Sequence, residues 1–150
     1  MIIRKANSSD IKKSLDIAKT LKQWFTKEAI KNMKIDFVIN NTIIVINKKE
    51  VIGFLCYNSD NGIIKLIWIG VEKEHQRKGI GKLMLDYLEK EARKIKSNYI
   101  EVETLTEKDN YKPYRLTRDF YKKYGFKKLY LKKAPKPRWD DVDVMGKKVK

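Results

Sequence analysis

Two glycines two positions apart, Gly79 and Gly81, interrupt a basic stretch directly before a strongly helical segment. Glycine has no Cβ, so the chain can turn tightly there and another group can approach the backbone N–H donors closely. The start of a helix adds unpaired N–H groups and a partial positive charge, which both favour an anion such as a phosphate. The segment EHQRKGIGK, residues 74–82, therefore indicates an anion-binding loop.

Glycines at this spacing can also do no more than shape a turn, and that alternative stays open at this point. Two common phosphate-binding motifs are excluded by the neighbouring residues. A Walker loop requires Ser or Thr after its Gly-Lys pair, whereas Leu83 follows Lys82. The dinucleotide fingerprint requires a third glycine at the position of Met84. The loop therefore belongs to neither class.

The flanking segments predict how this loop is held. Residues 63–71 are apolar enough for a buried strand, and apolar positions recur at helical spacing from Ile80 to about Ser97. The following YIEVETL alternates, with Ile100 and Val102 on one face and glutamates on the other. A strand, a helix and a second strand in this order predict a right-handed unit with parallel strands.

The remaining chain predicts further elements on the same grounds. Helices are expected from about Ile11, capped within Ser8–Asp10, from Thr26 to Met33, and from Pro113 to Tyr124 with Gly125 as the C′ residue. Strands are expected at residues 2–5, on both sides of a hairpin turn at 47–50, and at 126–131 and 142–149. We therefore predict an α+β fold, with a mixed sheet of about seven strands and about four helices, in one domain spanning residues 1–150.

The composition excludes only some of the possible binding partners. A net charge of +16 is compatible with nucleic acid, a membrane surface or a polyphosphate ligand, but the lysines are spread along the whole chain, as on a solvated surface. The one cysteine, Cys56, excludes an internal disulfide and is expected in the core. No apolar run predicts a transmembrane helix, and the first residues do not resemble a signal peptide. We expect a cytoplasmic protein without a membrane partner.

Two motifs carry a resemblance to a known family. QRKGIG, residues 76–81, fits the pattern [QR]-x-x-G-x-[GA], and FYKKYGF, residues 120–126, fits F-Y-x-x-x-G-F. Both motifs and the predicted order of elements resemble the GNAT superfamily of N-acetyltransferases over nearly the whole chain. The resemblance implies transfer of an acetyl group from acetyl-CoA to a primary amine of a small molecule or a protein, without a metal.

The resemblance also implies which residues bind acetyl-CoA. In the family, the glycine loop wraps the pyrophosphate with its backbone N–H groups, and the pantetheine arm pairs with the edge of the fourth strand. The residues at the matching positions of the loop are Gln76, Arg77, Lys78, Gly79, Ile80, Gly81 and Lys82, and those of the strand are Ile69, Gly70 and Val71. A glycine inside a bulky strand, as at position 70, also indicates a bulge or a close backbone approach.

Acetyl transfer needs a neutral amine and a proton donor for the departing thiolate. Tyr121 matches the tyrosine that often donates this proton in the family, although an aromatic residue packed in the core would show the same helical spacing. For the base, Glu101 and Glu103 lie on one face of the fifth predicted strand, where a solvated face is the alternative. Lys65 stands where other relatives have a glutamate, and His75 is interpreted as a loop residue. Since no cysteine occupies a motif position, direct attack in a ternary complex is expected.

The chain departs from the family at the helix that carries Tyr121. Tyr114 replaces a frequent asparagine that contacts CoA, and YRLTRDFY resembles a subset with Y-x-x-T-R-x-F-Y, whose acceptors are diverse. Contact with an acidic acceptor or with CoA phosphates is one interpretation of Arg115 and Arg118, and a solvated helix surface is the commoner one. The segment 138–145 is expected to line the acceptor site.

Two other functions remain as alternatives. The first is a basic nucleic-acid-binding module with Trp24, Tyr111 and Trp139 as stacking aromatics, which the absence of a nucleic-acid motif disfavours. The second is a CoA-binding regulatory domain without catalysis. The sequence leaves open whether the chain forms a homodimer and which amine it acetylates.

Overall fold

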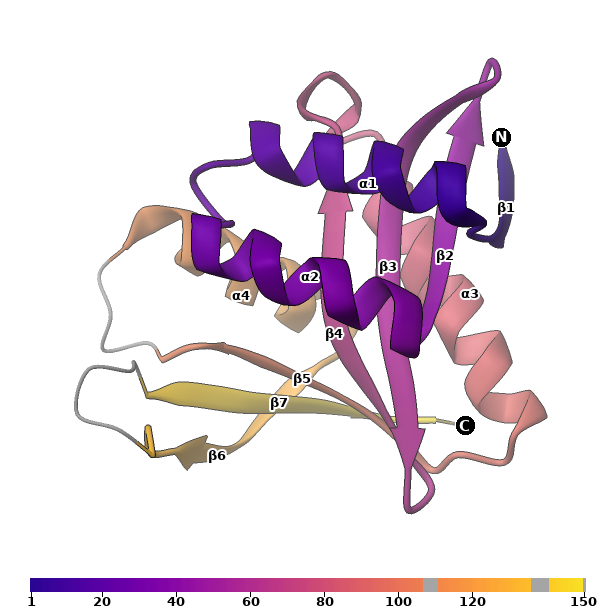
Figure 1. Ribbon diagram of the computed structural model, residues 1–150. Coiled ribbons are helices and arrows are strands. Elements are labelled where there is room, and N and C mark those ends of the chain that lie inside the picture. Colours follow the sequence, from indigo (N-terminus) through magenta and orange to yellow (C-terminus); the bar gives the residue numbers. More distant parts are fainter. Residues whose placement is uncertain (107–110, 136–140, 150) are drawn as a thin grey trace. The chain divides into compact units, whose positions relative to one another are not determined.

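A computed structural model describes residues 1–106, 111–135 and 141–149 of the chain. Its strands form one seven-stranded mixed sheet in the order β1-β2-β3-β4-β5-β7-β6, with β4 parallel to β5. The strands are β1 (Ile2–Lys5), β2 (Asn41–Asn47), β3 (Glu50–Asp60), β4 (Ile63–Val71), β5 (Tyr99–Leu105), β6 (Lys127–Lys132) and β7 (Val142–Lys148). The helices are α1 (Ser8–Thr20), α2 (Lys27–Ile39), α3 (Ile80–Lys94) and α4 (Lys112–Tyr124), with a short 3₁₀ turn at Lys73–His75. The predicted fold class is confirmed (Figure 1).

The chain clusters into two compact units, which we describe separately. The first unit comprises Met1–Asn58 and Leu66–Glu91, and the second comprises Ser59–Lys65 and Ala92–Lys150. We call them the N-terminal unit and the C-terminal unit. The predicted single domain stays a prediction.

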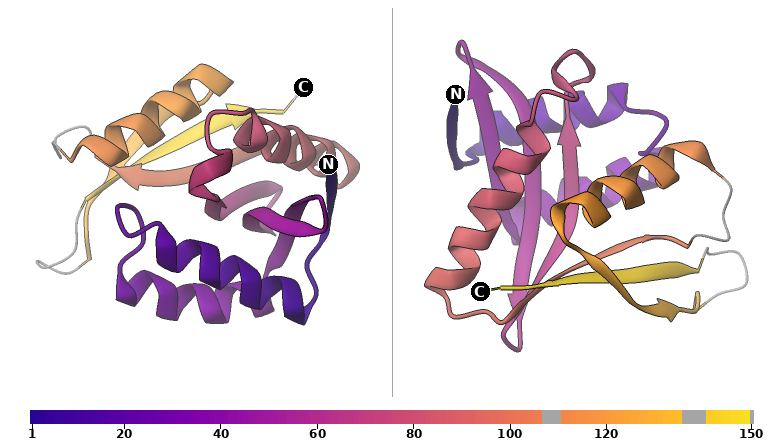
Figure 2. Two further views of the ribbon diagram at one scale, coloured as in Figure 1. Left: turned by 90° about the horizontal axis from the view of Figure 1, so that it is seen from above. Right: turned by 180° about the vertical axis from the view of Figure 1, so that it is seen from behind.

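The N-terminal unit has helices on both faces of its strands. Helices α1 and α2 lie on one face and α3 on the other (Figures 1 and 2). The core between α1, α2 and the strands is apolar because every third or fourth helical residue faces inward. It includes Ile17, Ala18, Met33, Phe37, Ile44 and Phe54. Cys56 lies in this core, as predicted, and its burial raises the pKa of the thiol to about 11.

The C-terminal unit has a simpler arrangement. Strands β5 and β6 both pair with β7 in antiparallel register, and α4 covers one face (Figure 2). The alternation predicted for β5 is confirmed, because Ile100 and Val102 are buried while Glu103 is exposed. Gly125 ends α4 in the left-handed conformation, with φ of 107°, as expected for a C′ glycine.

Two helix boundaries differ from the prediction. Helix α1 begins at Ser8 because Asn7, and not Ser8, Ser9 or Asp10, is the cap: its side chain accepts from the N–H of Asp10, whose carboxylate accepts from the N–H of Asn7. Helix α2 is capped by Thr26 as predicted but continues past Met33 to Ile39. Among the described residues, no helix has both the length and the apolar character needed to cross a membrane.

Candidate active site

The loop between β4 and α3 is fixed to the end of β4 by hydrogen bonds. The N–H of Glu72 donates to the carbonyl of Ile52 over 2.8 Å, which continues the contact between β3 and β4 beyond the last residue of β4. The side-chain Nε2 of Gln76 donates to the carbonyl of Val71 over 3.0 Å. Gln76 therefore closes the loop onto the strand, a structural role that the sequence did not indicate.

The two loop glycines have different backbone conformations. Gly79 has φ of 82°, and a Cβ added there would meet no atom within 4 Å, so the requirement for glycine is conformational. Arg77, with φ of 62°, also lies in the left-handed region, which is strained for a residue with a side chain. Gly81 is the second residue of α3 and lacks a positive φ. The turn therefore explains why residue 79 is a glycine. The backbone conformation at residue 81 does not require a glycine.

The first turn of α3 offers N–H donors and carries no acidic side chain. The N–H of Leu83 donates to the carbonyl of Gly79 over 3.0 Å. The preceding N–H groups, those of Ile80, Gly81 and Lys82, have no acceptor within the helix. The side chains of Arg77 and Lys78 are exposed beside them. This combination favours a bound anion.

Two further side chains of this region contact carboxylates. Nζ of Lys82 lies 3.0 Å from Oδ2 of Asp86, one helical turn later, and both side chains are exposed. Nδ1 of His75 lies 3.6 Å from Oε2 of Glu72 within the 3₁₀ turn. His75 therefore packs within the loop, where the sequence placed it.

Gly53 and Gly70 determine how closely α3 and β3 approach. A Cβ on Gly53 would lie 3.3 Å from the carbonyl oxygen of Gly70 and 3.4 Å from both Cγ2 of Ile80 and Cε of Met84. A Cβ on Gly70 would lie 2.5 Å from the ring of Phe54, so this glycine makes room for an aromatic ring. The sequence predicted a bulge or a close backbone approach at Gly70, whereas the group that lies close to it in the structure is a side-chain ring. Its role beside the pantetheine arm stays a prediction. Gly53 was missed, although a glycine within EVIGFLC is a signal of the same kind.

Tyr121 is buried within the C-terminal unit. Its side chain is 2% exposed, and its ring centroid lies 5.4 Å from those of both Phe120 and Phe126. Burial raises the pKa of the Tyr121 phenol above its ordinary value. The hydroxyl therefore stays protonated at neutral pH, as a proton donor must, but the packing is equally that of a core aromatic.

The two candidate bases differ in exposure. Glu101 is half-buried and lies opposite Gly146 on β7. Glu103 is exposed, and its Oε1 lies 2.8 Å from Nζ of Lys132 on β6. An exposed ion pair of this kind is typical of a solvated strand face. Glu101 is thus the better placed of the two to hold a carboxylate away from bulk water.

Arg118 contradicts its predicted exposure. The side chain is 5% exposed, and its Nη1 donates to the carbonyls of Leu105, over 2.8 Å, and Thr106, over 3.2 Å. The guanidinium therefore ties the middle of α4 to the end of β5, one helical turn before Tyr121. Its interpretation as a solvated arginine was wrong, because burial on a helix cannot be inferred from residue type alone. Arg115 is exposed, as expected.

Of the three aromatic residues proposed for base stacking, the structure describes Trp24 and Tyr111. Trp24 is half-buried and packs against the apolar core of the N-terminal unit, so only part of its side chain is exposed. Tyr111 is 43% exposed, and its ring lies 5.5 Å from that of Tyr114. Trp139 lies outside the described residues, as does the first part of the expected acceptor loop at 138–145.

The comparison with protein families decides the class. A family model described as an acetyltransferase (GNAT) domain matches residues 39–128, which include the glycine loop and Tyr121. The chain belongs to the GNAT acetyltransferase family. No curated protein matches the chain in sequence.

Solved GNAT structures share the fold over the full length. A GNAT-family protein from Desulfovibrio desulfuricans is similar with a TM-score of 0.87 and 20% identity, covering 99% of each chain. The ribosomal-protein-S18-alanine N-acetyltransferase from Escherichia coli has a TM-score of 0.78 and 16% identity, covering 99% of this chain and 93% of that one. The PaiA N-acetyltransferase from Thermoplasma acidophilum, in complex with coenzyme A, has a TM-score of 0.76 and 18% identity, covering 98% of each chain. At such identities the likeness extends to the fold alone.

The predicted GNAT site residues divide between the two units. The candidate cofactor residues, 69–71 and 76–82, all lie in the N-terminal unit, where β4 and the start of α3 bring them together. The candidate catalytic residues Tyr121, Glu101 and Glu103 all lie in the C-terminal unit. Their roles stay predictions. No group of three His, Cys, Asp or Glu side chains within the described ranges could hold a metal.

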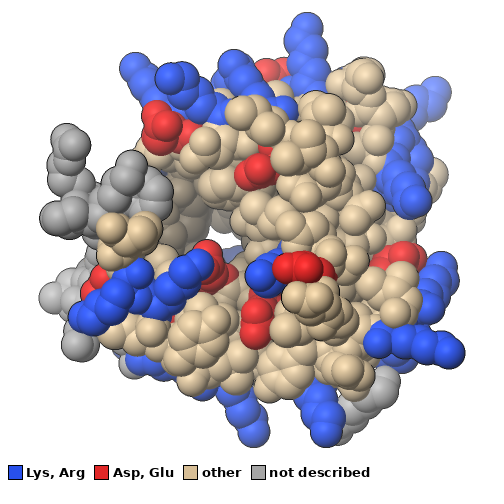
Figure 3. Space-filling model, turned by 60° about the horizontal axis from the view of Figure 1, so that its bottom comes forward, with Lys and Arg blue, Asp and Glu red and all other residues tan. Residues whose placement is uncertain are grey.

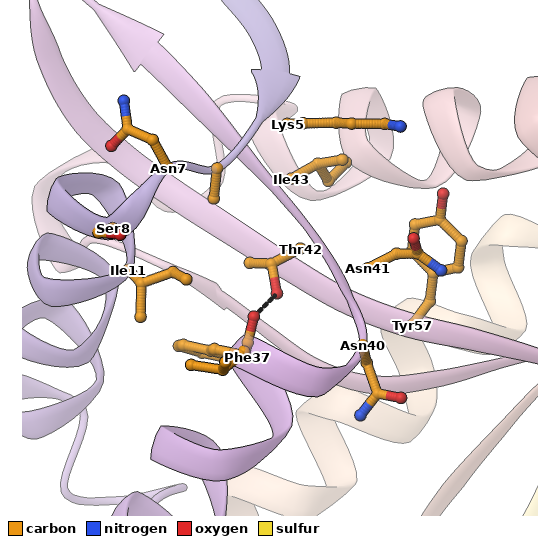
Figure 4. A pocket seen from close by; sticks show the side chains of 12 residues that line it. Lys5, Asn7, Ser8, Ile11, Phe37, Asn40, Asn41, Thr42, Ile43 and Tyr57 are labelled. Atoms are coloured by element: carbon orange, nitrogen blue, oxygen red, sulfur yellow. Dashed lines mark hydrogen bonds between the residues drawn. The ribbon is translucent and has the colours of Figure 1, made fainter.

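A hollow of about 410 Å³ lies elsewhere in the N-terminal unit (Figure 4). It opens where β1 leads into α1 and α2 leads into β2. The hydroxyl of Thr42 donates to the carbonyl of Phe37 over 3.0 Å at its wall, while Asn7 and Asn40 point away from each other. None of the candidate site residues lines this hollow. We assign it no role in the acetyltransferase site.

Proposed function

We propose that this chain is an acetyl-CoA-dependent N-acetyltransferase, which transfers the acetyl group to a primary amine by direct attack in a ternary complex. The observation that carries the proposal is the start of α3, with its N–H donors, its adjacent basic side chains and no acidic residue. The pyrophosphate of acetyl-CoA is the anion that the family binds. Gly81, with no conformational reason to be glycine, supports a close approach of the ligand to this turn.

The loop residues act in two ways under this proposal. The N–H groups of Ile80, Gly81 and Lys82 donate to the pyrophosphate oxygens, and Arg77 and Lys78 add positive charge. Gln76 holds the loop through its hydrogen bond to Val71 and need not touch the ligand. The backbone at Ile69 and Gly70 is the proposed partner of the pantetheine arm.

The chemical step then requires two proton transfers. The neutral amine attacks the thioester carbonyl, the C–N bond forms, and the C–S bond breaks as the thiolate leaves. We assign the proton for the thiolate to the Tyr121 phenol and removal of the amine proton to Glu101, with Glu103 as the other candidate. Cys56, buried with a pKa raised to about 11, is unsuited to a covalent acetyl-enzyme.

The cofactor part of the proposal can be tested with a matched pair of glycines. Gly79 and Gly62 both have positive φ, 82° and 76°, and a Cβ on either would meet no atom within 4 Å. Substitution by valine should cost each variant roughly 1–3 kcal/mol of stability through backbone strain. Only Gly79→Val should also weaken acetyl-CoA binding, by at least tenfold in isothermal titration calorimetry. Equal affinities in the two variants would exclude the loop as the pyrophosphate site.

The acceptor can be sought with a screen of primary amines, including protein N-termini, lysine peptides, polyamines and aminoglycosides. Release of free CoA, detected with a thiol reagent, should depend on both the acceptor and the enzyme. A protein that binds acetyl-CoA but releases no thiol with any amine would instead be the regulatory CoA-binding domain.

A further inference from the structure

Helix α2 carries apolar side chains on two faces. Its inner face is buried in the core of the N-terminal unit through Ile30, Met33 and Phe37. Its outer face exposes Ile35 to 61%, Val38 to 70% and Ile39 to 70%. Because these three residues are spaced i, i+3 and i+4, they are neighbours on the helix surface and form one patch. We call them the α2 patch.

The composition of the α2 patch is unusual for a solvated helix. Branched side chains such as Ile and Val lower helix propensity, and Lys, Glu or Ala would serve an exposed position better. The exposed positions of α1 are polar, and α3 and α4 each expose one leucine, Leu83 and Leu116. Within the described part of the chain, the α2 patch is thus the largest group of exposed aliphatic residues on any helix. A patch of this kind marks an interaction surface.

The charges along α2 indicate what covers the patch. The last turn of α2 has no basic residue, so the partial negative charge of its carbonyl end is not offset by its own side chains. Exposed Lys31 and Lys34 lie one turn before Ile35 and Val38, respectively. The exposed carboxylate of Glu28 lies one turn before Lys31 and offsets one of these two charges. The outer face is therefore positive before the patch and negative after it. A second α2 in antiparallel orientation presents the complementary order.

We infer that the α2 patch forms the centre of a symmetric dimer, in which α2 of one copy packs antiparallel against α2 of another. Lys31 is eight residues before Ile39, which is roughly 12 Å along a helix axis. With the two patches superposed, each Lys31 reaches the carbonyl end of the partner's α2. The same residues face each other across the two-fold axis, as an isologous contact requires.

The size of the patch sets the strength of this dimer. Three exposed aliphatic side chains offer on the order of 300 Å² of apolar surface per copy. A standard stable interface buries about 800 Å² per partner, so the α2 patch offers less than half of the surface of such an interface. The dimer is therefore reversible and forms with increasing protein concentration.

Sedimentation velocity of the full chain over a hundredfold range of concentration tests the inference. Wild type should shift from monomer to dimer, and Val38→Lys should remain monomeric throughout. Lys31→Glu should raise the dissociation constant at least threefold, because it places like charges together at each helix end. Leu116→Lys, an equally exposed aliphatic on α4, is the control and should dimerise like wild type. Circular dichroism establishes that each variant is folded.

Three outcomes would overturn the inference. Wild type could remain monomeric at all concentrations, or Val38→Lys could dimerise as strongly as wild type. Wild type could also remain monomeric and co-sediment with vesicles of mixed zwitterionic and anionic lipid, with Val38→Lys abolishing that binding. The α2 patch would then be a membrane-binding surface. If Val38→Lys does not fold, Ile39→Gln makes the same comparison with a smaller change.

Discussion

Single residues decide the chemistry, and Tyr121 has the most specific proposed role among them. Tyr121→Phe removes one oxygen and keeps the ring that packs between Phe120 and Phe126. If the phenol protonates the CoA thiolate, turnover with a verified amine should fall by roughly 10²–10⁴ while acetyl-CoA affinity stays nearly unchanged. Steady-state kinetics and calorimetry measure the two quantities. Wild-type turnover in this variant would leave Tyr121 as a core residue only.

The ionisation of one carboxylate, that of Asp10, contributes to the stability of the folded protein. Burial alone would raise the pKa of Asp10, but hydrogen bonds from Arg4 and from the N–H of Asn7 lower it below its ordinary value. A lowered pKa in the folded state contributes stability that is present above the unfolded pKa and is lost as the pH falls through the folded one. Asp10→Asn should therefore cost about 1–2 kcal/mol at pH 7 and clearly less in acid, at a pH below the folded-state pKa of Asp10. Urea unfolding at both pH values checks this.

The candidate site could be predicted at the residue scale only where a motif fixed the position. The glycine loop and Tyr121 stand in motifs, so their places were evident. The burial of Arg118 could not be predicted. An arginine on an amphipathic helix has the same sequence signal whether it is solvated or donates to carbonyls of another element. Gln76 shows the same limit, because no local pattern indicates that its amide bonds to Val71.

At the scale of elements, the two hairpin turns of the N-terminal half form an instructive contrast. The turn from β3 to β4 has Asn61 and Gly62 at positive φ, which is the preferred pair for a two-residue turn. The turn from β2 to β3 holds Lys48 and Lys49 at φ of 50° and 69°, a conformation that lysine adopts only with strain. The first hairpin therefore forms despite its turn, through the pairing of its strands.

Relieving this strain should stabilise the protein. We expect Lys48→Asn with Lys49→Gly to raise the free energy of unfolding by about 1 kcal/mol, because both new residues tolerate the left-handed region. The reciprocal change, Asn61→Lys with Gly62→Lys, should lower it by a similar amount. Chemical denaturation of both variants measures the effect. If the first change does not raise the free energy of unfolding, the positive φ angles of Lys48 and Lys49 cost the folded state no measurable stability.

The elements themselves were predictable because strands and helices bury their apolar residues at different periods. The strands at 63–71 and 99–105 were found at the residues where they occur. The end of α2 was not found, because its second half is apolar on both faces and no longer shows the 3.6-residue spacing of apolar residues. What keeps this half helical is tertiary, because Phe37 is buried in the core.

At the scale of the whole molecule, the excess of basic residues raises the question of nucleic acid. On the face shown in Figure 3, Lys and Arg side chains lie mainly around the periphery, with Asp and Glu among them. This distribution resembles a solvated surface more than a continuous basic track. The order of elements was predictable at this scale, whereas the grouping into two units depends on contacts distant in sequence.

Stabilisation of the intact protein by a ligand distinguishes the proposed acetyltransferase from the alternative, a nucleic-acid-binding module. Acetyl-CoA at one hundred times its dissociation constant should add about 2.7 kcal/mol of stability and raise the melting temperature by about 5–10 °C. A DNA or RNA oligonucleotide at physiological salt should have no effect. The opposite pattern, a salt-dependent shift with the oligonucleotide and none with acetyl-CoA, would favour the nucleic-acid-binding module.

The first turn of α3 has a consequence for the exchange of amide protons with solvent. The amides of Ile80, Gly81 and Lys82 precede the first backbone hydrogen bond of the helix, so they should exchange with deuterium quickly while the rest of α3 is protected. A bound pyrophosphate would accept hydrogen bonds from these N–H groups and slow their exchange. Three adjacent amides thus form a built-in reporter of occupancy, which can identify ligands before any amine acceptor is known.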